Sequence, residues 1–166
     1  MRAESVKLAV EALKEAGVSI AVYLPDSYLK ELYEAVVKDP DIRSVCVTNE
    51  GEGVAICGGV FASGKRAVMI MENSGIRVAA EPLARMGLGH GVPVVMIMSY
   101  RGDIGEKNWW GVPHGITMEP ILQALRIPYR VVRRDGEIKE AILDAFHHAY
   151  SSYYHTAVVM AGSVVR

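Results

Sequence analysis

The sequence predicts a three-layer α/β/α fold built on a doubly wound parallel sheet of about six strands. Apolar, strand-like runs alternate with segments of helical periodicity along all 166 residues, the pattern of consecutive βαβ units. No linker or internal repeat interrupts this alternation, so we expect a single domain over residues 1–166. The run at 93–99 is continuously apolar, as expected of a strand covered by helices on both faces.

The helices are predicted from apolar periodicity and from the glycines that can end them. Gly17 and Gly64 each follow a periodic segment and can adopt the left-handed conformation of a helix C-terminus. The predicted helices cover residues 4–16, 29–37, 50–63, 78–88, 118–125 and 138–149.

The strands are short apolar runs that stop at polar or turn-forming residues. We expect the second strand to be buried, and we expect loops at 72–75 and 100–116. The longer loop contains Gly, Pro and Trp and has no periodicity, and such loops inside compact domains are often functional. The predicted strands cover residues 19–24, 43–48, 67–71, 93–99, 129–132 and 156–160.

Composition and charge exclude several classes of protein. Hydrophobic residues make up 51% and charged residues 22%, which excludes a disordered chain, and the net charge of -1 predicts no binding to nucleic acid. No apolar run is long enough to span a membrane, and the N-terminus reads as an amphipathic helix rather than a signal peptide. Cys46 and Cys57 lack metal-ligand spacing, so we expect buried free thiols, no metal bound by this chain and a cytoplasmic location.

Polar residues follow three of the predicted strands directly. They are Asp26-Ser27, Asn49-Glu50 and Asn73-Ser74, and a fourth strand leads into the loop that holds His114. Each group alone could simply cap a helix or form a turn. Because ligands bind at the carboxyl ends of strands in this architecture, their common position favours a functional site. Trp109-Trp110 in the same loop could form a lid or a subunit contact.

The helix after Glu50 is rich in glycine, which costs roughly 1 kcal/mol per residue relative to alanine. The four glycines therefore indicate close approach of a neighbouring helix or of a bound ring. A dinucleotide fingerprint is disfavoured, because the third required glycine is missing and acidic side chains would face the phosphates. The glycines are Gly51, Gly53, Gly58 and Gly59.

Motifs spread over most of the chain carry a resemblance to a known family. They are Leu24-Pro25-Asp26-Ser27, Asn49-Glu50-Gly51-Glu52, Ala55, Gly58-Gly59, Phe61-Ala62, Gly64-Lys65-Arg66, Glu72-Asn73-Ser74-Gly75 and Leu125-Arg126-Ile127-Pro128-Tyr129. In these positions the chain resembles the pyrimidine-binding domain of thiamine diphosphate enzymes, in particular the decarboxylases of sulfopyruvate and phosphonopyruvate.

The resemblance implies a role for each candidate residue. Glu50 would hydrogen-bond N1′ of the cofactor's aminopyrimidine, with Glu52 as the rival carboxylate for this role. Asp26 and His114 would handle protons. Glu50, Asn73, Ser74 and Gly75 would bind the cofactor, and Ser27 and Asn73 would contact the substrate.

The resemblance also implies a partner. Enzymes of this group hold the diphosphate through Mg²⁺ with a Gly-Asp-Gly motif on a second domain, whereas here Gly102-Asp103 is followed by Ile104. We therefore expect a β subunit that carries the diphosphate and Mg²⁺, together with self-association of the chain.

The expected reaction is decarboxylation of a 2-oxo acid, with sulfopyruvate giving sulfoacetaldehyde and CO2 and phosphonopyruvate as the variant. Arg77, Arg101 or Lys107 could bind either anionic head group. A non-catalytic α/β module that binds a partner, in which Glu50 only caps its helix, is the alternative.

Overall fold

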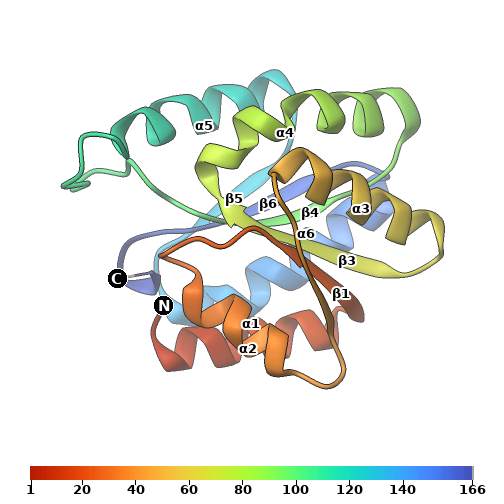
Figure 1. The fold of residues 1–166 in the computed structure, drawn as a ribbon, viewed down its shortest axis with the longest axis horizontal. Coiled ribbons are helices and arrows are strands. Elements are labelled where there is room, and N and C mark those ends of the chain that lie inside the picture. The colour runs from red at the N-terminus through yellow and green to blue at the C-terminus, as the bar shows by residue number, and fades with distance from the viewer. Residues whose placement is uncertain (166) are drawn as a thin grey trace.

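A six-stranded sheet forms the centre of the protein, and the computed structural model describes residues 1–165 (Figure 1). Its strands are all parallel and follow the order β2-β1-β3-β4-β6-β5. The strands are β1 (Val18–Tyr23), β2 (Arg43–Cys46), β3 (Arg66–Glu72), β4 (Val95–Ser99), β5 (Tyr129–Val132) and β6 (Thr156–Met160). The α-helices are α1 (Ala3–Glu15), α2 (Lys30–Lys38), α3 (Glu50–Ala62), α4 (Ile76–Leu83), α5 (Val112–Ala124) and α6 (Ile138–Ser152).

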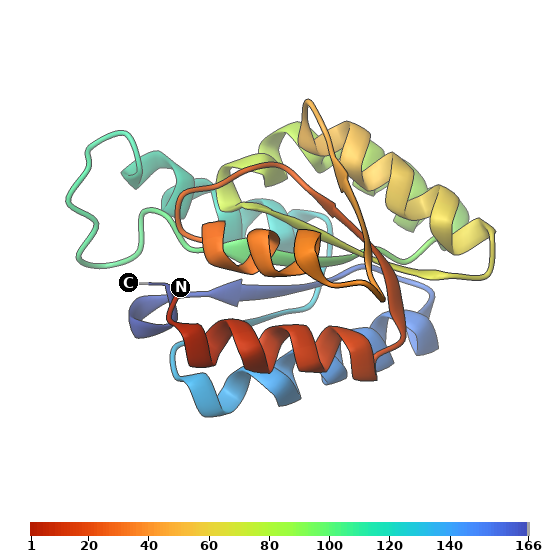
Figure 2. The same ribbon diagram turned by 60° about the horizontal axis from the view of Figure 1, so that its bottom comes forward.

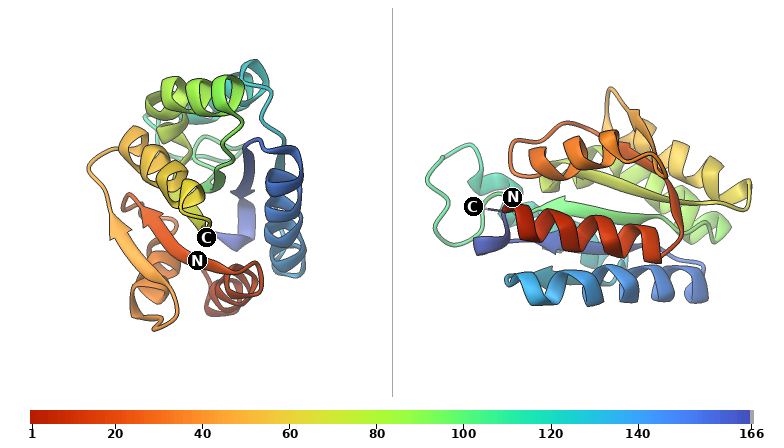
Figure 3. Two further views of the ribbon diagram at one scale, coloured as in Figure 1. Left: turned by 90° about the vertical axis from the view of Figure 1, so that its right-hand side faces the viewer. Right: turned by 90° about the horizontal axis from the view of Figure 1, so that it is seen from below.

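The helices cover both faces of the sheet. Helices α1, α2 and α6 pack on one face and α3, α4 and α5 on the other, and Figure 3 shows the sheet between these two layers. The predicted three-layer, doubly wound architecture is therefore confirmed. No helix within residues 1–165 has the length and apolarity needed to cross a membrane.

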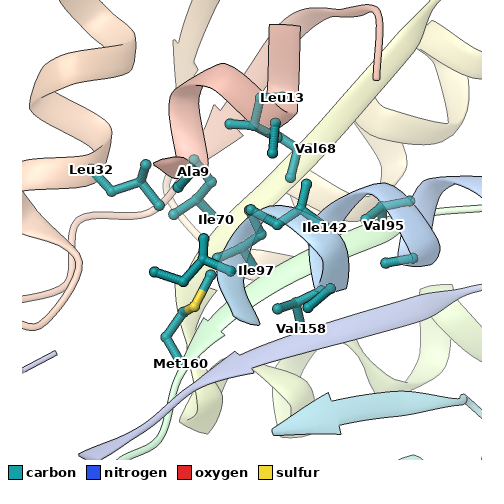
Figure 4. Close-up of a cluster of buried hydrophobic side chains, with 14 of the residues drawn as sticks. Ala9, Leu13, Leu32, Val68, Ile70, Val95, Ile97, Ile142, Val158 and Met160 are labelled. Carbon is teal, nitrogen blue, oxygen red and sulfur yellow. The ribbon is translucent and has the colours of Figure 1, made fainter. Parts of the chain in front are cut away.

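Each face of the sheet has its own apolar core. The core under α1, α2 and α6 joins helix residues such as Leu13 and Ile142 to Ile70 and Ile97 of the central strands (Figure 4). All four side chains are at most 1% exposed, and each contributes about 1.5–3 kcal/mol by leaving water. The core fixes the central strands, and with them the positions at which these strands end.

The second strand differs from the prediction. Strand β2 lies at the edge of the sheet and pairs only with β1, so its residues are partly or fully exposed. The expectation of a buried strand was wrong, because an apolar composition does not reveal which strand lacks a second neighbour. Cys46 on this strand is exposed rather than buried. Cys57 in α3 is buried as expected, and burial raises the pKa of its thiol to about 12.

Three segments near the strand ends are more helical than predicted. The expected loop at 72–75 contains a 3-10 turn, Asn73–Gly75, that leads directly into α4. The expected helix at 78–88 begins earlier, contains Pro82 and continues from Ala84 to Gly89 as a π-helix. The long loop ends at residue 111, because α5 starts at Val112 with a proline in its first turn, a favoured position.

Two of the four glycines in α3 serve packing within the chain. A Cβ placed on Gly53 would lie 2.5 Å from Met69 Sδ, and one on Gly58 would lie 1.7 Å from Met86 Cε. A neighbouring helix and the sheet therefore explain these two glycines. Gly59 differs, because its Cβ would have no neighbour within 4 Å.

Candidate active site

The candidate site lies where β1, β3 and β4 end, on the edge of the sheet from which the 100–111 loop projects (Figure 2). In the order β2-β1-β3-β4-β6-β5 the chain runs in opposite directions from β1, so β1 and β3 flank the switch point of the sheet. Crevices at such switch points are the usual ligand sites of open α/β sheets. Asp26 follows β1, Glu72 ends β3 and Ser99 ends β4.

The two rival carboxylates at the start of α3 have different environments. Asn49 caps the helix, since its Oδ1 accepts a hydrogen bond of 3.0 Å from the Glu52 N–H. The Glu52 carboxylate is exposed and accepts two bonds of 2.8 Å from the backbone and hydroxyl of Thr48, which lower its pKa. Glu50 is only 8% exposed, and its carboxylate accepts no hydrogen bond from the residues that the structure describes. Glu52 therefore belongs to the cap, and Glu50 is available for a ligand.

Gly75 forms the wall against which Glu50 lies. A Cβ on Gly75 would lie 2.4 Å from Glu50 Cγ and 2.6 Å from Glu50 Oε1. Any side chain at this position would push the carboxylate away. The backbone angles of Gly75 are ordinary helical values, φ -63 and ψ -21, so close approach rather than conformation explains the glycine.

Glu72 is the centre of the polar network, and the sequence did not single it out. Its Oε1 accepts a hydrogen bond of 2.7 Å from Ser74 Oγ and lies 3.6 Å from His114 Nε2. Its Oε2 lies 3.6 Å from Arg101 Nε. Two sequence signals mark it: it is a charged residue at the end of an apolar strand, and it begins the motif Glu72-Asn73-Ser74-Gly75.

His114 comes from α5, where the sequence predicted a loop. Its side chain is 19% exposed and lies between Glu72 and Arg77, whose Nη2 is 2.8 Å from His114 Nδ1. The residue therefore lies beside Glu72 at the candidate site, and it is held there by the first turn of a helix rather than by a loop.

Arg101 links the long loop to the site. Its guanidinium carbon lies 3.9 Å from the centre of the Tyr28 ring, and its Nη2 donates a hydrogen bond of 3.2 Å to Ser27 Oγ. The buried Asn73 amide binds the Arg101 backbone in both directions, accepting from its N–H at 3.1 Å and donating to its carbonyl at 2.8 Å. Both ends of the Asn73 amide thus hold this arginine.

Asp26 is a buried acid with one unsatisfied oxygen. The Leu29 N–H donates to its Oδ2 at 3.2 Å, while Oδ1 and the buried Ser99 Oγ make no hydrogen bond of ordinary geometry within residues 1–165. Burial raises the pKa of Asp26, and the charge of Glu72 raises it further. The nearby Ser99 hydroxyl and the backbone N–H groups of Tyr28 and Leu29 partly offset this rise.

Two glycines bring Arg101 and His114 to the same place. A Cβ on Gly102 would lie 2.4 Å from the Gly111 carbonyl oxygen, and one on Gly115 would lie 2.2 Å from the Gly102 carbonyl oxygen. The loop and the start of α5 therefore meet backbone against backbone. Since each glycine neighbours a site residue in sequence, this contact sets the separation of those two side chains.

The candidates predicted from the sequence therefore gather at one edge of the sheet, with Glu72 and Ser99 added to them. Trp109 and Trp110 remain 80% and 51% exposed, outside the network. Lys107 is also exposed, beside a hollow of about 180 Å³ that Tyr28 helps to line.

The fold and this edge define an α/β domain with a candidate ligand site at the switch point, next to a buried carboxylate that has no hydrogen-bond partner within residues 1–165. The family model for the thiamine pyrophosphate enzyme, N-terminal TPP binding domain, matches residues 4–125. The chain therefore belongs to this family, whose cofactor is thiamine diphosphate, and the predicted family and cofactor are confirmed.

Relatives named as decarboxylases cover most of the chain. The sulfopyruvate decarboxylase subunit alpha of Methanothermobacter thermautotrophicus is 35% identical over 142 residues, 86% of each chain. That of Methanococcus maripaludis is 27% identical over 150 residues, 90% of each chain. The phosphonopyruvate decarboxylase of Streptomyces viridochromogenes is 35% identical over 99 residues, which are 60% of this chain and 25% of the relative.

The site residues fit the pyrimidine end of the cofactor. Within residues 1–165, Glu50 offers a buried acceptor without a protein donor, and Gly75 leaves the space that this carboxylate occupies. Asp26 Oδ1 is a second buried oxygen that lacks a hydrogen bond of ordinary geometry to these residues. The amino group of a heterocycle, or a ring nitrogen that carries a proton, can supply the donor that such an oxygen lacks.

Proposed function

We propose that the chain is the α subunit of a thiamine diphosphate-dependent decarboxylase that converts sulfopyruvate to sulfoacetaldehyde and CO2. The carrying observation is the buried, unpartnered Glu50 carboxylate at the switch point of a chain whose relatives bear this name. When bound, thiamine diphosphate supplies the electron sink for loss of CO2 from a 2-oxo acid.

Glu50 is proposed to act on the pyrimidine by holding a proton between its carboxylate and the N1′ atom. The side chain is positioned by the first turn of α3 and by its contact with Gly75. Glu52 is less suited to this role, because its carboxylate is exposed and Oε2 is held by two bonds from Thr48.

Asp26 and His114 are proposed to hold protons on the substrate side of the site. Because burial raises the pKa of Asp26, this acid favours its neutral form, and a proton on Oδ1 could be donated to Ser99 Oγ or to substrate. His114 faces Glu72 through Nε2. The site thus contains two proton-carrying groups of different chemistry.

The remaining polar side chains either contact substrate or cofactor or hold another residue of the site in place. We propose that Ser27 and Ser74 contact substrate or cofactor through their hydroxyl groups. Asn73 was predicted to do both, but each end of its amide is bound to the Arg101 backbone. Its proposed role is therefore to position Arg101.

The substrate's second acidic group is proposed to meet Arg101. Arg101 borders Glu72, whereas Arg77 is engaged with His114 Nδ1 and Lys107 lies farther out on the exposed loop. Sulfonate and phosphonate make similar demands on a guanidinium. The choice of sulfopyruvate over phosphonopyruvate therefore rests on the relatives, whose matches to subunit alpha cover far more of their length.

A β subunit is proposed to complete the site with the diphosphate and Mg²⁺. Large apolar side chains surround the open edge and are unusually exposed, with Ile104 at 100%, Trp109 at 80% and Ile116 at 67%. Clustered exposure of this kind marks a surface that another chain covers. The open face of α3 at Gly59 offers a second close contact, to the β subunit or to a second copy of this chain.

The test compares Glu50→Gln with Glu52→Gln in the chain co-expressed with its cognate β subunit. Formation of sulfoacetaldehyde and CO2 is measured with thiamine diphosphate and Mg²⁺, and phosphonopyruvate is assayed in parallel. We expect Glu50→Gln to lower turnover by about 10²-fold or more with assembly intact. Glu52→Gln is the matched control, because glutamine can still accept both bonds from Thr48.

Each outcome has a distinct meaning. Turnover of phosphonopyruvate alone would correct the substrate and retain the enzyme. Full activity of Glu50→Gln would contradict the role of that carboxylate. A complex that binds no thiamine diphosphate would favour the non-catalytic partner-binding module.

A further inference from the structure

Arg77 and His114 meet across two helices at the rim of the site. Arg77 lies in the first turn of α4 and His114 in the first turn of α5, and these helices pack against each other. The contact joins Arg77 Nη2 to His114 Nδ1 at 2.8 Å, a normal hydrogen-bond length. Arg77 Nε also points to the Ser74 carbonyl oxygen at 3.4 Å.

The chemistry of the two groups decides which nitrogen of His114 carries the proton. A guanidinium has only donors, so the Nδ1 atom that it binds must be an acceptor without a hydrogen. The single proton of the neutral ring then resides on Nε2. A second proton on Nδ1 would break the hydrogen bond and place two positive charges in contact.

The groups around the other side of the ring agree with this assignment. Nε2 lies 3.6 Å from Glu72 Oε1, a carboxylate oxygen that can only accept while it is ionised. The same oxygen accepts from Ser74 Oγ, and Arg101 lies 3.6 Å from the second oxygen of Glu72. The acidic partner of His114 is thus held in place by a hydroxyl and an arginine.

We infer that Arg77 is a positioning residue that fixes His114 as the neutral Nε2–H tautomer, so that this imidazole serves the site as a hydrogen-bond donor through Nε2. The inference rests on the proposed function for its catalytic meaning. A hydrogen bond from Nε2 can be donated to an oxygen atom of the bound 2-oxo acid and can orient it. The proton stays on His114 throughout, so no bond to the ring is broken and Nδ1 remains bound to Arg77.

Nitrogen-15 NMR of the histidine rings in the full-length chain tests the tautomer without any substrate. The five histidines are labelled, and His114 is assigned from the signal that is lost in His114→Gln. We expect an unprotonated Nδ1 and a protonated Nε2 in the wild-type chain at neutral pH. In Arg77→Met the donor to Nδ1 is gone, and we expect the Nδ1–H tautomer of His114 to become populated.

Arg85→Met is the matched control, because Arg85 lies farther along the same helical segment and its salt bridge is to Glu81. It should leave the His114 signals unchanged. A proton on Nδ1 of the wild-type ring would overturn the inference even if Arg77→Met failed to fold. An unprotonated Nδ1 in a folded Arg77→Met chain would overturn it as well.

The assembled enzyme supplies the catalytic readout. With Arg77→Met we expect kcat/KM of the assembled complex to fall by about 10-fold because the Nε2–H donor is mispositioned, whereas Arg85→Met should retain the wild-type value. An unchanged kcat/KM in Arg77→Met would contradict a role of this donor in the site. If the wild-type complex does not turn over sulfopyruvate, the proposed function fails, whereas the NMR result still decides the tautomer.

Discussion

Gly75→Ala tests whether the position of Glu50, rather than its presence alone, supports the activity. The new Cβ would lie 2.4 Å from Glu50 Cγ, whereas ordinary van der Waals contact begins at 3.4 Å, so the side chain must move by about 1 Å. Misplacing a reacting group by that distance can cost about 10²-fold in rate. We expect a loss of that size in turnover of the assembled complex.

The same substitution should leave folding nearly unaffected. Gly75 already has helical backbone angles, and alanine is favoured over glycine in a helix by up to about 1 kcal/mol, which offsets the contact with a movable side chain. Gly136→Ala is the control, since its Cβ would meet nothing within 4 Å and the residue lies outside the site network. It should retain activity.

Turnover and thiamine diphosphate affinity of wild type, Gly75→Ala, Glu50→Gln and the double variant form the assay. If both changes disable the same proton transfer, the double variant should be no slower than Glu50→Gln alone. Additive losses would refute the reasoning, because they would mean that Gly75 acts independently of Glu50. Wild-type kinetics for Gly75→Ala would refute it as well.

Two further substitutions test the acid and the loop. Asp26→Asn should stabilise the protein at neutral pH while lowering activity. The pKa of Asp26 is raised in the folded state, so ionising this residue costs stability, and the cost vanishes below the ordinary aspartate pKa of about 3.9. Equal melting temperatures of wild type and Asp26→Asn across pH 3–7 would contradict this. Gly115→Ala places a Cβ 2.2 Å from the Gly102 carbonyl oxygen and should lower stability by about 1–3 kcal/mol, which denaturant unfolding would measure.

The fold class could be predicted because each strand and helix carries its own periodicity. The order of the strands could not, because β6 inserts between β4 and β5 through contacts distant in sequence. The exposure of β2 follows from that order, which explains why its apolar run was read as a buried strand.

The site was predicted only in part. Asp26 and Glu50 were found because polar residues that follow apolar strands meet at one sheet edge, and their roles stay predictions. Ser99 was missed because it ends a run in which every neighbour is apolar and buried. Glu72 was missed because its importance comes from what surrounds it, His114 and Arg101, both from distant segments.

The contact between Gly102 and Gly115 explains how the long loop and α5 place Arg101 and His114 in fixed positions at the end of β3. Side chains on a long loop lose much conformational freedom when they bind, which weakens any site that they form. Here the backbones of the loop and α5 touch directly, and Asn73 ties the Arg101 backbone to the turn after β3. The arginine is therefore ordered during folding of the chain, so the cofactor and the β subunit encounter an edge that is already assembled.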